Sequence, residues 1–204
     1  MSTPPAGAQM SEDGNYWWDE QNQQWQLANA SPAQSADPSA QQSQDPNAGG
    51  QGTTQISVHQ SVSLVAQPTE QSCWAASIAM LLNMTPQDVV QQAGMSLDEG
   101  YGWDQIEPAA KTLGLAELAP ACGMPDLLAS WVQDNGPLWV VEVGAPYHAV
   151  VVAGVEGDGS VDGTHVIVYN PWPPNGGAVE NPTFTAFEQD FELGAGSKAA
   201  ILHR

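Results

Sequence analysis

The sequence contains very few basic residues. Its 204 residues include only three Lys and Arg residues, Lys111, Lys198 and Arg204, against 23 Asp and Glu residues, which gives a formal net charge of −20. Binding to nucleic acid or to an anionic membrane surface requires Lys and Arg side chains that contact phosphate groups. We therefore expect no nucleic-acid partner. We interpret the acidic charge as one that keeps the chain soluble, with attraction of cationic partners as the alternative.

Long apolar runs are also missing. No run approaches the roughly 18 apolar residues that a membrane-spanning helix needs, so we expect no membrane insertion. Residues 1–9 lack a positively charged region followed by an apolar stretch, and we therefore expect no classical secretory signal peptide. We expect synthesis in the cytoplasm, with export by a dedicated secretion system as an open route.

Cysteine is scarce, and the histidines are scattered. Two cysteines, Cys73 and Cys122, are too few for a disulfide scaffold. The four His residues lack the spacing of metal ligands, and the sequence has no Gly-rich phosphate loop. These absences predict a protein without a metal or another cofactor.

The first quarter of the chain differs in composition from the rest. Residues 1–11 and 28–55 are dominated by small and polar residues that cannot bury enough surface to offset chain entropy, and we predict that both are disordered. Residues 12–27 between them contain two aromatic runs around a polar centre, which indicates a Trp-rich β-hairpin. Because isolated hairpins are marginally stable, this segment folds back on the main domain, is a partly ordered tail, or acts as a recognition or targeting module.

Residues 56–204 form the predicted folded domain. A strand is predicted first, followed by helices and then by short Val- and Ala-rich runs that are typical of an antiparallel sheet. Helices that precede a sheet indicate the α+β class. The predicted helices cover residues 73–83, 85–94, 104–113 and 125–133, and the predicted strands cover residues 56–65, 138–143, 148–155, 165–169 and 199–202.

Cys73 lies where the first of these helices begins, after the turn-rich residues 68–72. A thiol is a good nucleophile only as the thiolate, which a helix N-terminus and a nearby imidazolium both stabilise. A small buried hydrophobic residue is the alternative role for any single cysteine. Cys122 has no neighbouring His or matching motif, and we interpret it as structural.

The residues around Cys73 resemble the nucleophile segment of the papain family. Residues 67–75 read Gln-Pro-Thr-Glu-Gln-Ser-Cys-Trp-Ala, and in that family a Gln lies six residues before the Cys and Trp-Ala follows it. The resemblance implies that Cys73 is the nucleophile and that Gln67 and the Cys73 backbone N–H form the oxyanion hole. It also places Trp74 beside the reacting groups. Gln71 is the competing oxyanion donor.

The base must be a His on a separate element. His148 is followed by Ala-Val and an apolar run that contains Gly154. This segment resembles the one that carries the base in the papain family, and the resemblance assigns His148 that role. A polar end-cap of a strand is the alternative role. His165 is the fallback base, and His59 near the start of the domain and His203 near the end of the sequence are the remaining candidates.

The third member of the site should orient the imidazole. The papain family has an Asn followed two residues later by a Trp that shields the Asn–His hydrogen bond. Asn170 and Trp172 match these positions, although Pro171 replaces the Ser of papain and bacterial relatives often have an acidic residue before Pro. A turn-forming Asn before Pro is the alternative. Asp158 and Asp162 are weaker candidates for the orienting role.

Together, these segments resemble compact bacterial papain-like proteases, including effector proteases that are injected into host cells. The resemblance implies a papain-like α+β fold in which the nucleophile helix packs on a C-terminal antiparallel sheet. It implies a cysteine protease that hydrolyses a protein or peptide through a Cys-His-Asn triad and a thioester, in the role of a delivered bacterial effector or toxin. A cognate inhibitor or immunity protein is an expected partner. A peptidoglycan amidase, a protein deamidase with the same triad and a non-catalytic binding module are the alternatives.

Overall fold

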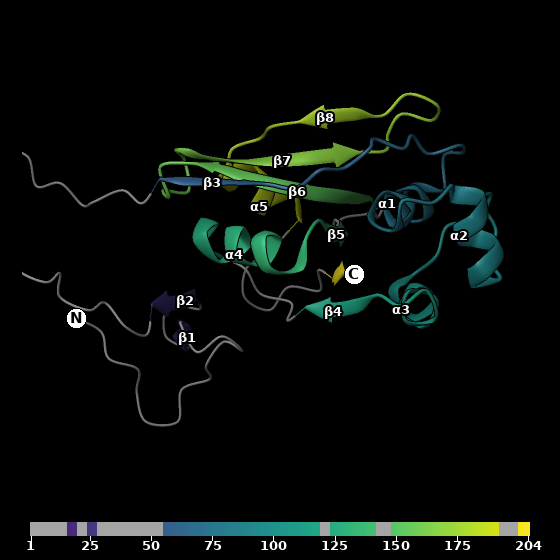
Figure 1. Cartoon of the computed structure of the whole chain (residues 1–204), viewed down its shortest axis with the longest axis horizontal. Coiled ribbons are helices and arrows are strands. Elements are labelled where there is room, and N and C mark those ends of the chain that lie inside the picture. Colours follow the sequence, from purple (N-terminus) through teal and green to yellow (C-terminus); the bar gives the residue numbers. More distant parts are fainter. Residues whose placement is uncertain (1–15, 20–23, 28–54, 119–122, 142–147, 192–199) are drawn as a thin grey trace, which may run out of the picture. The chain divides into compact units, whose positions relative to one another are not determined.

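The structure, a computed structural model, describes residues 16–19, 24–27, 55–118, 123–141, 148–191 and 200–204. The chain divides into two compact units, Met1–Thr53 and Thr54–Arg204 (Figure 1). Within the described ranges, no helix has the length and apolar character needed to cross a membrane.

The first unit contains one pair of described strands. β1 (Tyr16–Asp19) and β2 (Gln24–Leu27) pair antiparallel, with Tyr16 opposite Leu27. Both strands fall within the predicted hairpin-like segment 12–27. The predicted disordered residues lie outside the described ranges, apart from Gln55, and the domain boundaries therefore stay a prediction.

The second unit is built on a seven-stranded sheet in which all strand pairs are antiparallel. The strands follow the order β4-β9-β5-β6-β7-β8, and β3 also pairs with β6. Their bounds are β3 Ile56–His59, β4 Ala116–Leu118, β5 Leu138–Val141, β6 Ala149–Gly157, β7 Thr164–Asn170, β8 Ala178–Glu180 and β9 Ile201–His203.

β6 is the central strand of this sheet. One side of β6 pairs with β5 along its first half and with β3 along its second half, whereas β7 pairs along the other side. A Cβ atom on Gly154 would lie 2.7 Å from the Val58 carbonyl oxygen, so the close approach of β3 requires glycine here. The first seven residues of β6 are buried, which explains why this strand has a continuous apolar sequence.

Five helices are described, and their sequences explain how they begin and end. Thr85 caps α2 by accepting the Asp88 backbone N–H at 3.1 Å, and Gly94 ends the helix in the left-handed conformation. The side chains of α1 are buried on nearly all sides of the helix, which agrees with its apolar sequence. The helices are α1 Cys73–Leu82, α2 Pro86–Ala93, α3 Trp103–Thr112, α4 Pro125–Asn135 and α5 Phe184–Phe191.

Four observed elements differ from the predicted ones. The first strand of the domain ends at His59 instead of residue 65, because the chain leaves the sheet after Gln60 bonds to β6. β4 and β8 were not predicted, since three residues are too few to show alternation. α5 was also missed, although its three Phe residues recur at helical spacing and are all buried.

The helix that carries Cys73 is held against the sheet by a buried core. Ile78 of α1, Trp139 of β5 and Val151 of β6 are all fully buried. The buried Ser77 hydroxyl donates a hydrogen bond of 2.9 Å to the Ala149 carbonyl, which joins α1 to the first residue of β6. Figure 1 shows α1 at the end of the sheet toward which β7 runs. This packing positions the functional site.

Candidate active site

Cys73 is the first residue of α1 and is half-buried. Ser72 occupies the N-cap position, but its side chain does not cap the helix. The Ser72 hydroxyl instead accepts the Thr69 backbone N–H at 3.0 Å and lies 3.1 Å from the Thr69 carbonyl oxygen. The first-turn N–H groups of α1 therefore have no side-chain cap, and the positive end of the helix dipole faces Cys73.

The surroundings of Cys73 lower the pKa of its thiol. Burial is the largest influence and acts to raise this pKa. A hydrogen bond with the His148 side chain, backbone hydrogen bonds from Ala149 and Trp74 and the positive charge of the imidazolium together outweigh burial. The site therefore stabilises the thiolate form of Cys73 relative to a free cysteine.

His148 immediately precedes β6, and its ring is held by Asn170 at the end of β7. The distance from His148 Nε2 to Asn170 Oδ1 is 2.7 Å. The Trp172 backbone N–H donates to the same Oδ1 atom at 3.0 Å. A backbone N–H can only donate, so Oδ1 is the acceptor and Nε2 carries the proton of the shared bond. Nδ1 is then the ring nitrogen that can bond the thiol.

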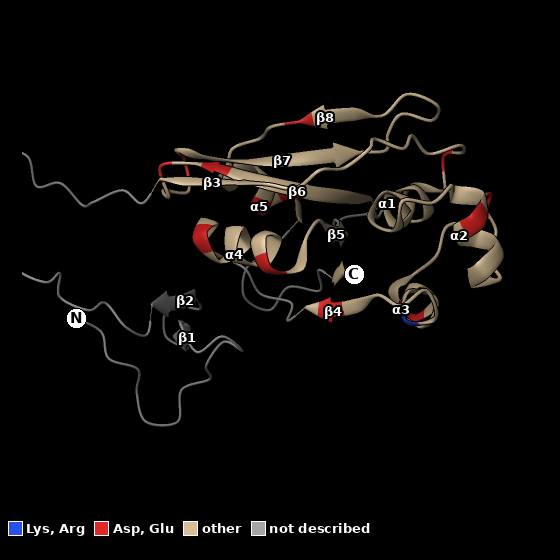
Figure 2. Cartoon of the chain, in the orientation of Figure 1, with Lys and Arg blue, Asp and Glu red and all other residues tan. Residues whose placement is uncertain are grey.

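The other side of the Asn170 amide contacts β8. Asn170 Nδ2 donates to Glu180 Oε1 at 2.9 Å. Glu180 lies opposite Val168 in the β7–β8 register, diagonally across from Asn170 on the same face of the sheet. Glu180 is exposed and is the acidic residue of β8 (Figure 2). Sequence analysis missed Glu180 because the three-residue strand that carries it was not predicted.

Gln67 is fully buried between the segments that carry Cys73 and Asn170. Its backbone N–H donates to the Pro171 carbonyl at 3.0 Å, and its carbonyl accepts the Asn175 N–H at 2.9 Å. The Gln67 Nε2 atom donates to the Thr69 carbonyl at 2.7 Å, while Oε1 has no hydrogen-bond partner among the described residues. The structure therefore places Gln67 between the turn before α1 and the loop after β7.

Gln71, the competing oxyanion donor, has a different environment. Its side chain is exposed, and its Oε1 atom lies against Gly100, where an added Cβ would approach it to 2.7 Å. Gln71 has none of the backbone hydrogen bonds that tie Gln67 to the loop after β7.

The two tryptophans of the predicted site lie in different environments. Trp74 is 2% exposed, and its ring meets Tyr101 edge-on with centroids 5.5 Å apart. Trp172 is 46% exposed, and its described link to Asn170 is the backbone N–H bond. Trp74 therefore packs in the core beneath the site, and the shielding role of Trp172 stays a prediction.

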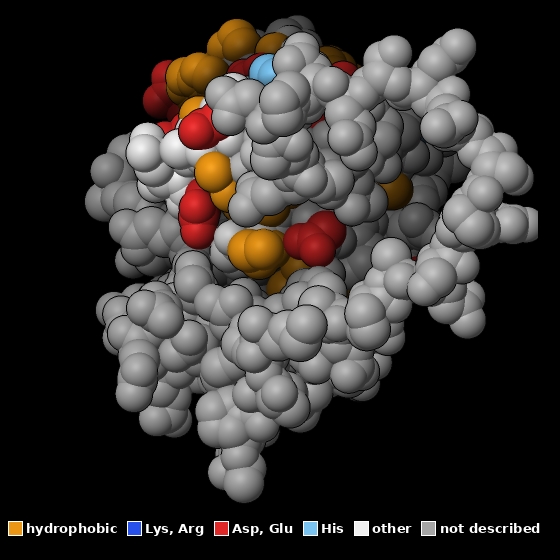
Figure 3. Space-filling view, turned by 90° about the vertical axis from the view of Figure 1, so that its left-hand side faces the viewer, with side chains coloured by type: hydrophobic (Ala, Val, Ile, Leu, Met, Phe, Trp, Pro, Cys, Tyr) orange, Lys and Arg blue, Asp and Glu red, His pale blue; other side chains and the backbone are white. Residues whose placement is uncertain are grey.

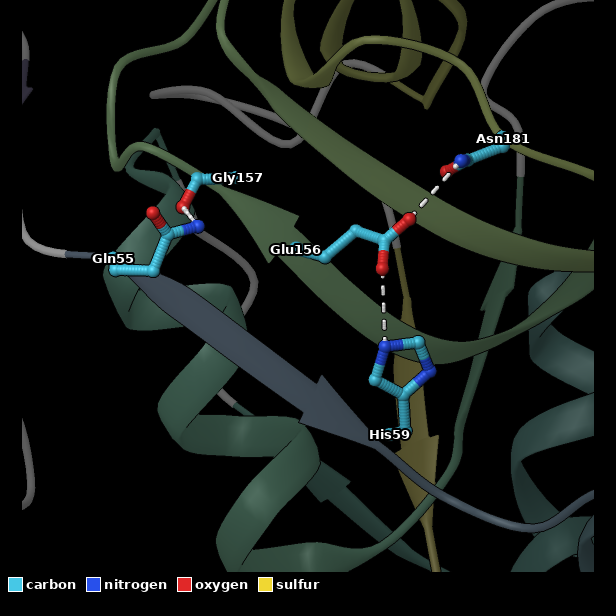
Figure 4. A network of polar contacts seen from close by, with 5 residues as sticks. All are labelled: Gln55, His59, Glu156, Gly157 and Asn181. Carbon is cyan, nitrogen blue, oxygen red and sulfur yellow. Dashed lines mark hydrogen bonds and ion pairs between the residues drawn. The ribbon is translucent and has the colours of Figure 1, made fainter.

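The three alternative candidates, His59, His165 and His203, have other contacts, and His203 Nδ1 lies 3.0 Å from the Arg204 carbonyl oxygen. His59 Nε2 lies 3.2 Å from the Glu156 carboxylate (Figure 4). His165 Nδ1 lies 3.0 Å from the Asn181 carbonyl oxygen. His59 and His165 both pair with the second half of β6, whereas His148 precedes its first residue. Of these four histidines, His148 is the one that bonds the thiol.

The alternative orienting acids lie far from His148. Asp158 and Asp162 are in the turn that joins β6 to β7, at the opposite end of the nine-residue strand β6. At a rise of about 3.3 Å per residue, this strand separates them from His148 by roughly 25 Å. The Asp158 carboxylate accepts hydrogen bonds from Ser160, and Asp162 accepts one from Thr185 at 2.7 Å. Asn170 is therefore the residue that holds the imidazole.

Asp and Glu residues are scattered over the described helices, strands and turns of the domain (Figure 2). Lys111 on α3 pairs with Glu107 one turn away. On the face shown in Figure 3, the described residues present acidic and hydrophobic side chains and no visible Lys or Arg. Among the described residues, no group of three His, Cys, Asp or Glu could hold a metal ion. Cys122, which was interpreted as structural, lies outside the described residues.

Comparison with solved structures finds distant likenesses. The peptidase domain of Streptococcus ComA, a bi-functional ABC transporter involved in quorum sensing, is 21% identical, with a TM-score of 0.46, and the match covers 69% of this chain and 96% of that one. A double glycine motif protease from an AMS/PCAT transporter, in complex with its leader peptide, is 18% identical, with a TM-score of 0.46 and coverage of 74% and 98%. UfSP from C. elegans is 15% identical, with a TM-score of 0.43 and coverage of 74% and 34%.

Comparison with curated proteins found no match. Comparison with protein families gives a more specific result. Residues 51–192 match the family described as papain-like cysteine protease AvrRpt2. The matched residues make up most of the chain and include the segments of Cys73, His148 and Asn170. The chain therefore belongs to the AvrRpt2 family of papain-like cysteine proteases, and it is a cysteine peptidase that acts on a protein or peptide substrate.

Proposed function

We propose that this peptidase cleaves its substrate through a triad of Cys73, His148 and Asn170, with Gln67 as an oxyanion donor. The observation that carries the proposal is the hydrogen-bond chain that links all three triad residues. Asn170 Oδ1 lies 2.7 Å from His148 Nε2, and His148 bonds the Cys73 thiol and lowers its pKa. A nucleophile, a base that contacts it and a group that orients the base are the parts that acyl transfer requires.

The first half of the reaction forms a thioester. The Cys73 thiolate attacks the carbonyl carbon of the scissile amide, a C–S bond forms, and an electron pair moves onto the carbonyl oxygen. The His148 imidazolium then gives its proton to the amide nitrogen as the C–N bond breaks and the amine leaves. Asn170 keeps Nε2 protonated and fixed, so that Nδ1 faces the sulfur and transfers this proton.

Two N–H groups are assigned to the oxyanion in this proposal. One is the backbone N–H of Cys73 at the N-terminus of α1. The other comes from the Gln67 side-chain amide, whose Nε2 already donates to the Thr69 carbonyl at 2.7 Å and has a second hydrogen. Because Gln67 is fully buried and its amide is held by Thr69, its donor would need little reorganisation during the reaction.

The second half of the reaction releases the acyl group. Neutral His148 accepts a proton from a water molecule while the water oxygen attacks the thioester carbon. The C–S bond then breaks, the carboxylic acid product leaves, and the thiolate–imidazolium pair forms again. No cofactor is needed to balance this cycle.

The proposal also includes a biological role as a delivered bacterial effector or toxin. It is supported by the resemblance of the Cys73 segment to compact bacterial effector proteases and by the name AvrRpt2 in the family description. Such a role implies export by a dedicated secretion system and a cognate inhibitor or immunity protein in the producing cell.

The test is cleavage of a complex protein mixture, read as new protein N-termini by mass spectrometry. The Cys73→Ala variant should lose activity by about three orders of magnitude or more, because it removes the nucleophile. The matched control, Cys122→Ala, should cleave like the wild type. Cleavage by Cys73→Ala at the wild-type rate would disprove the triad. Release of ammonia without new N-termini would instead indicate deamidation.

A further inference from the structure

Glu180 contacts the triad at a point that the proposed mechanism does not use. The Asn170 amide lies between His148 on one side and Glu180 on the other. Glu180 is on β8, which forms the edge of the sheet next to β7. A carboxylate that accepts a side-chain amide hydrogen forms a charge-assisted bond, which is stronger than a bond between neutral groups.

All three polar partners of the Asn170 amide require the same orientation. Oδ1 lies 2.7 Å from His148 Nε2 and accepts the Trp172 N–H at 3.0 Å, and Nδ2 donates to Glu180 Oε1 at 2.9 Å. A flipped amide would place two donors together at Trp172 and two acceptors together at Glu180. It would also present N–H groups to His148 Nε2, which would then have to lose its proton.

We propose that Glu180 is a positioning residue that holds Asn170 with Oδ1 toward His148 and thereby maintains the imidazolium that pairs with Cys73. This inference rests on the proposed triad. Glu180 acts through Asn170 and touches neither the substrate nor the reacting atoms.

The same contact explains why position 170 is Asn. An Asp there would keep an acceptor for His148, but its second oxygen would lie against the Glu180 carboxylate. Two carboxylates at hydrogen-bond distance repel each other unless they share a proton. An amide satisfies both neighbours at once, because it offers an acceptor to His148 and a donor to Glu180.

The test uses the full chain and needs no known substrate. Iodoacetamide alkylates Cys73 in proportion to its thiolate fraction, and mass spectrometry follows the rate at pH about 7. A thiol with an ordinary pKa of about 8.5 is only about 3% ionised at that pH, so the available range is roughly 30-fold. Glu180→Gln keeps an acceptor oxygen and should alkylate within about twofold of the wild type.

Glu180→Lys is the more disruptive variant, because it replaces the acceptor of Asn170 Nδ2 with a donor. We expect alkylation of Cys73 to slow about tenfold, as expected if only about a tenth of the thiol stays ionised at this pH. Glu117→Lys is the matched control: it makes the same charge change on the exposed edge strand β4 and should alkylate like the wild type.

Exchange of donor and acceptor completes the test. In Asn170→Asp combined with Glu180→Lys, the carboxylate accepts from both the ammonium and His148, so the rate should recover to within about threefold of the wild type. Asn170→Asp alone should be slower than this double variant, because two carboxylates then face each other. A double variant that is as slow as the two single effects combined would overturn the role of Glu180.

Two further results separate this inference from the proposed triad. Rapid, His148-dependent alkylation of Cys73 in the wild type, with no effect of Glu180→Lys, would overturn the role of Glu180 alone. Alkylation of wild-type Cys73 that is no faster than in His148→Ala would overturn the triad itself. Thermal unfolding checks each variant, and Glu180→Leu, which removes the acceptor without adding charge, replaces Glu180→Lys if the latter does not fold.

Discussion

His148 and Asn170 are 22 positions apart in the chain, yet their side chains share a hydrogen bond of 2.7 Å. The antiparallel pairing of β6 and β7 causes this proximity, because the residue before β6 meets the last residue of β7 at one end of the hairpin. The base and the group that orients it therefore form one local unit. Cys73 reaches this unit from α1, which Ser77 ties to the start of β6.

Replacement of Asn170 by Ala should reduce peptidase activity about 10- to 100-fold. Without the Oδ1 acceptor, the imidazole loses its fixed orientation and the imidazolium loses a hydrogen bond. The measurement is kcat/KM for a peptide taken from an identified cleavage site. Asn181→Ala is the control, because its side-chain amide bonds Glu156 away from the triad and its loss should leave kcat/KM unchanged. Equal activity of the two variants would contradict the role of Asn170.

Gln67→Ala should separate oxyanion stabilisation from thiol activation. We expect kcat to fall by about 10²- to 10³-fold through loss of an oxyanion donor. Alkylation of Cys73 by iodoacetamide should change little, because this reaction forms no oxyanion. Gln71→Ala, which removes the exposed neighbouring amide, should retain full activity. The reverse result, with Gln71→Ala inactive and Gln67→Ala active, would reassign the oxyanion donor.

Ser77→Ala should lower the free energy of unfolding by about 1–2 kcal/mol, because a buried hydrogen bond to the Ala149 carbonyl is lost. Denaturation in urea measures this change. Activity should fall as well, since the bond fixes α1 relative to the strand that follows His148. Ser130→Ala, whose half-buried hydroxyl bonds the Leu127 carbonyl within α4, should have a smaller effect on stability and none on activity.

Much of the site could be predicted because its residues lie in segments with strong local signals. Cys73 begins an apolar helix after a turn, and His148 immediately precedes an apolar strand, so the elements at both positions follow from periodicity and composition. The order of Gln67, Cys73, His148 and Asn170 along the chain then indicated a papain-like family, which the family comparison confirmed. Helix caps such as Thr85 could also be predicted from the sequence, because capping depends on residues that are close together in the chain.

The remaining features depend on long-range pairing that has no local signal. Glu180 lies in a three-residue strand whose position is set by the register of β8 on β7. The burial of Gln67 depends on backbone bonds to Pro171 and Asn175, more than a hundred positions away. The separation of His59 and His165 from the triad also follows from sheet order, which the sequence pattern does not encode.

Activation of Cys73 by His148 is the central claim, and the pH dependence of Cys73 alkylation tests it most directly. Because the thiol pKa is lowered, we expect the wild-type rate to stay nearly constant as the pH falls below the ordinary value of about 8.5. In His148→Ala only burial and the backbone bonds remain, so the pKa should rise and the rate should fall about tenfold per pH unit below it. Identical profiles for the wild type and His148→Ala would contradict the account.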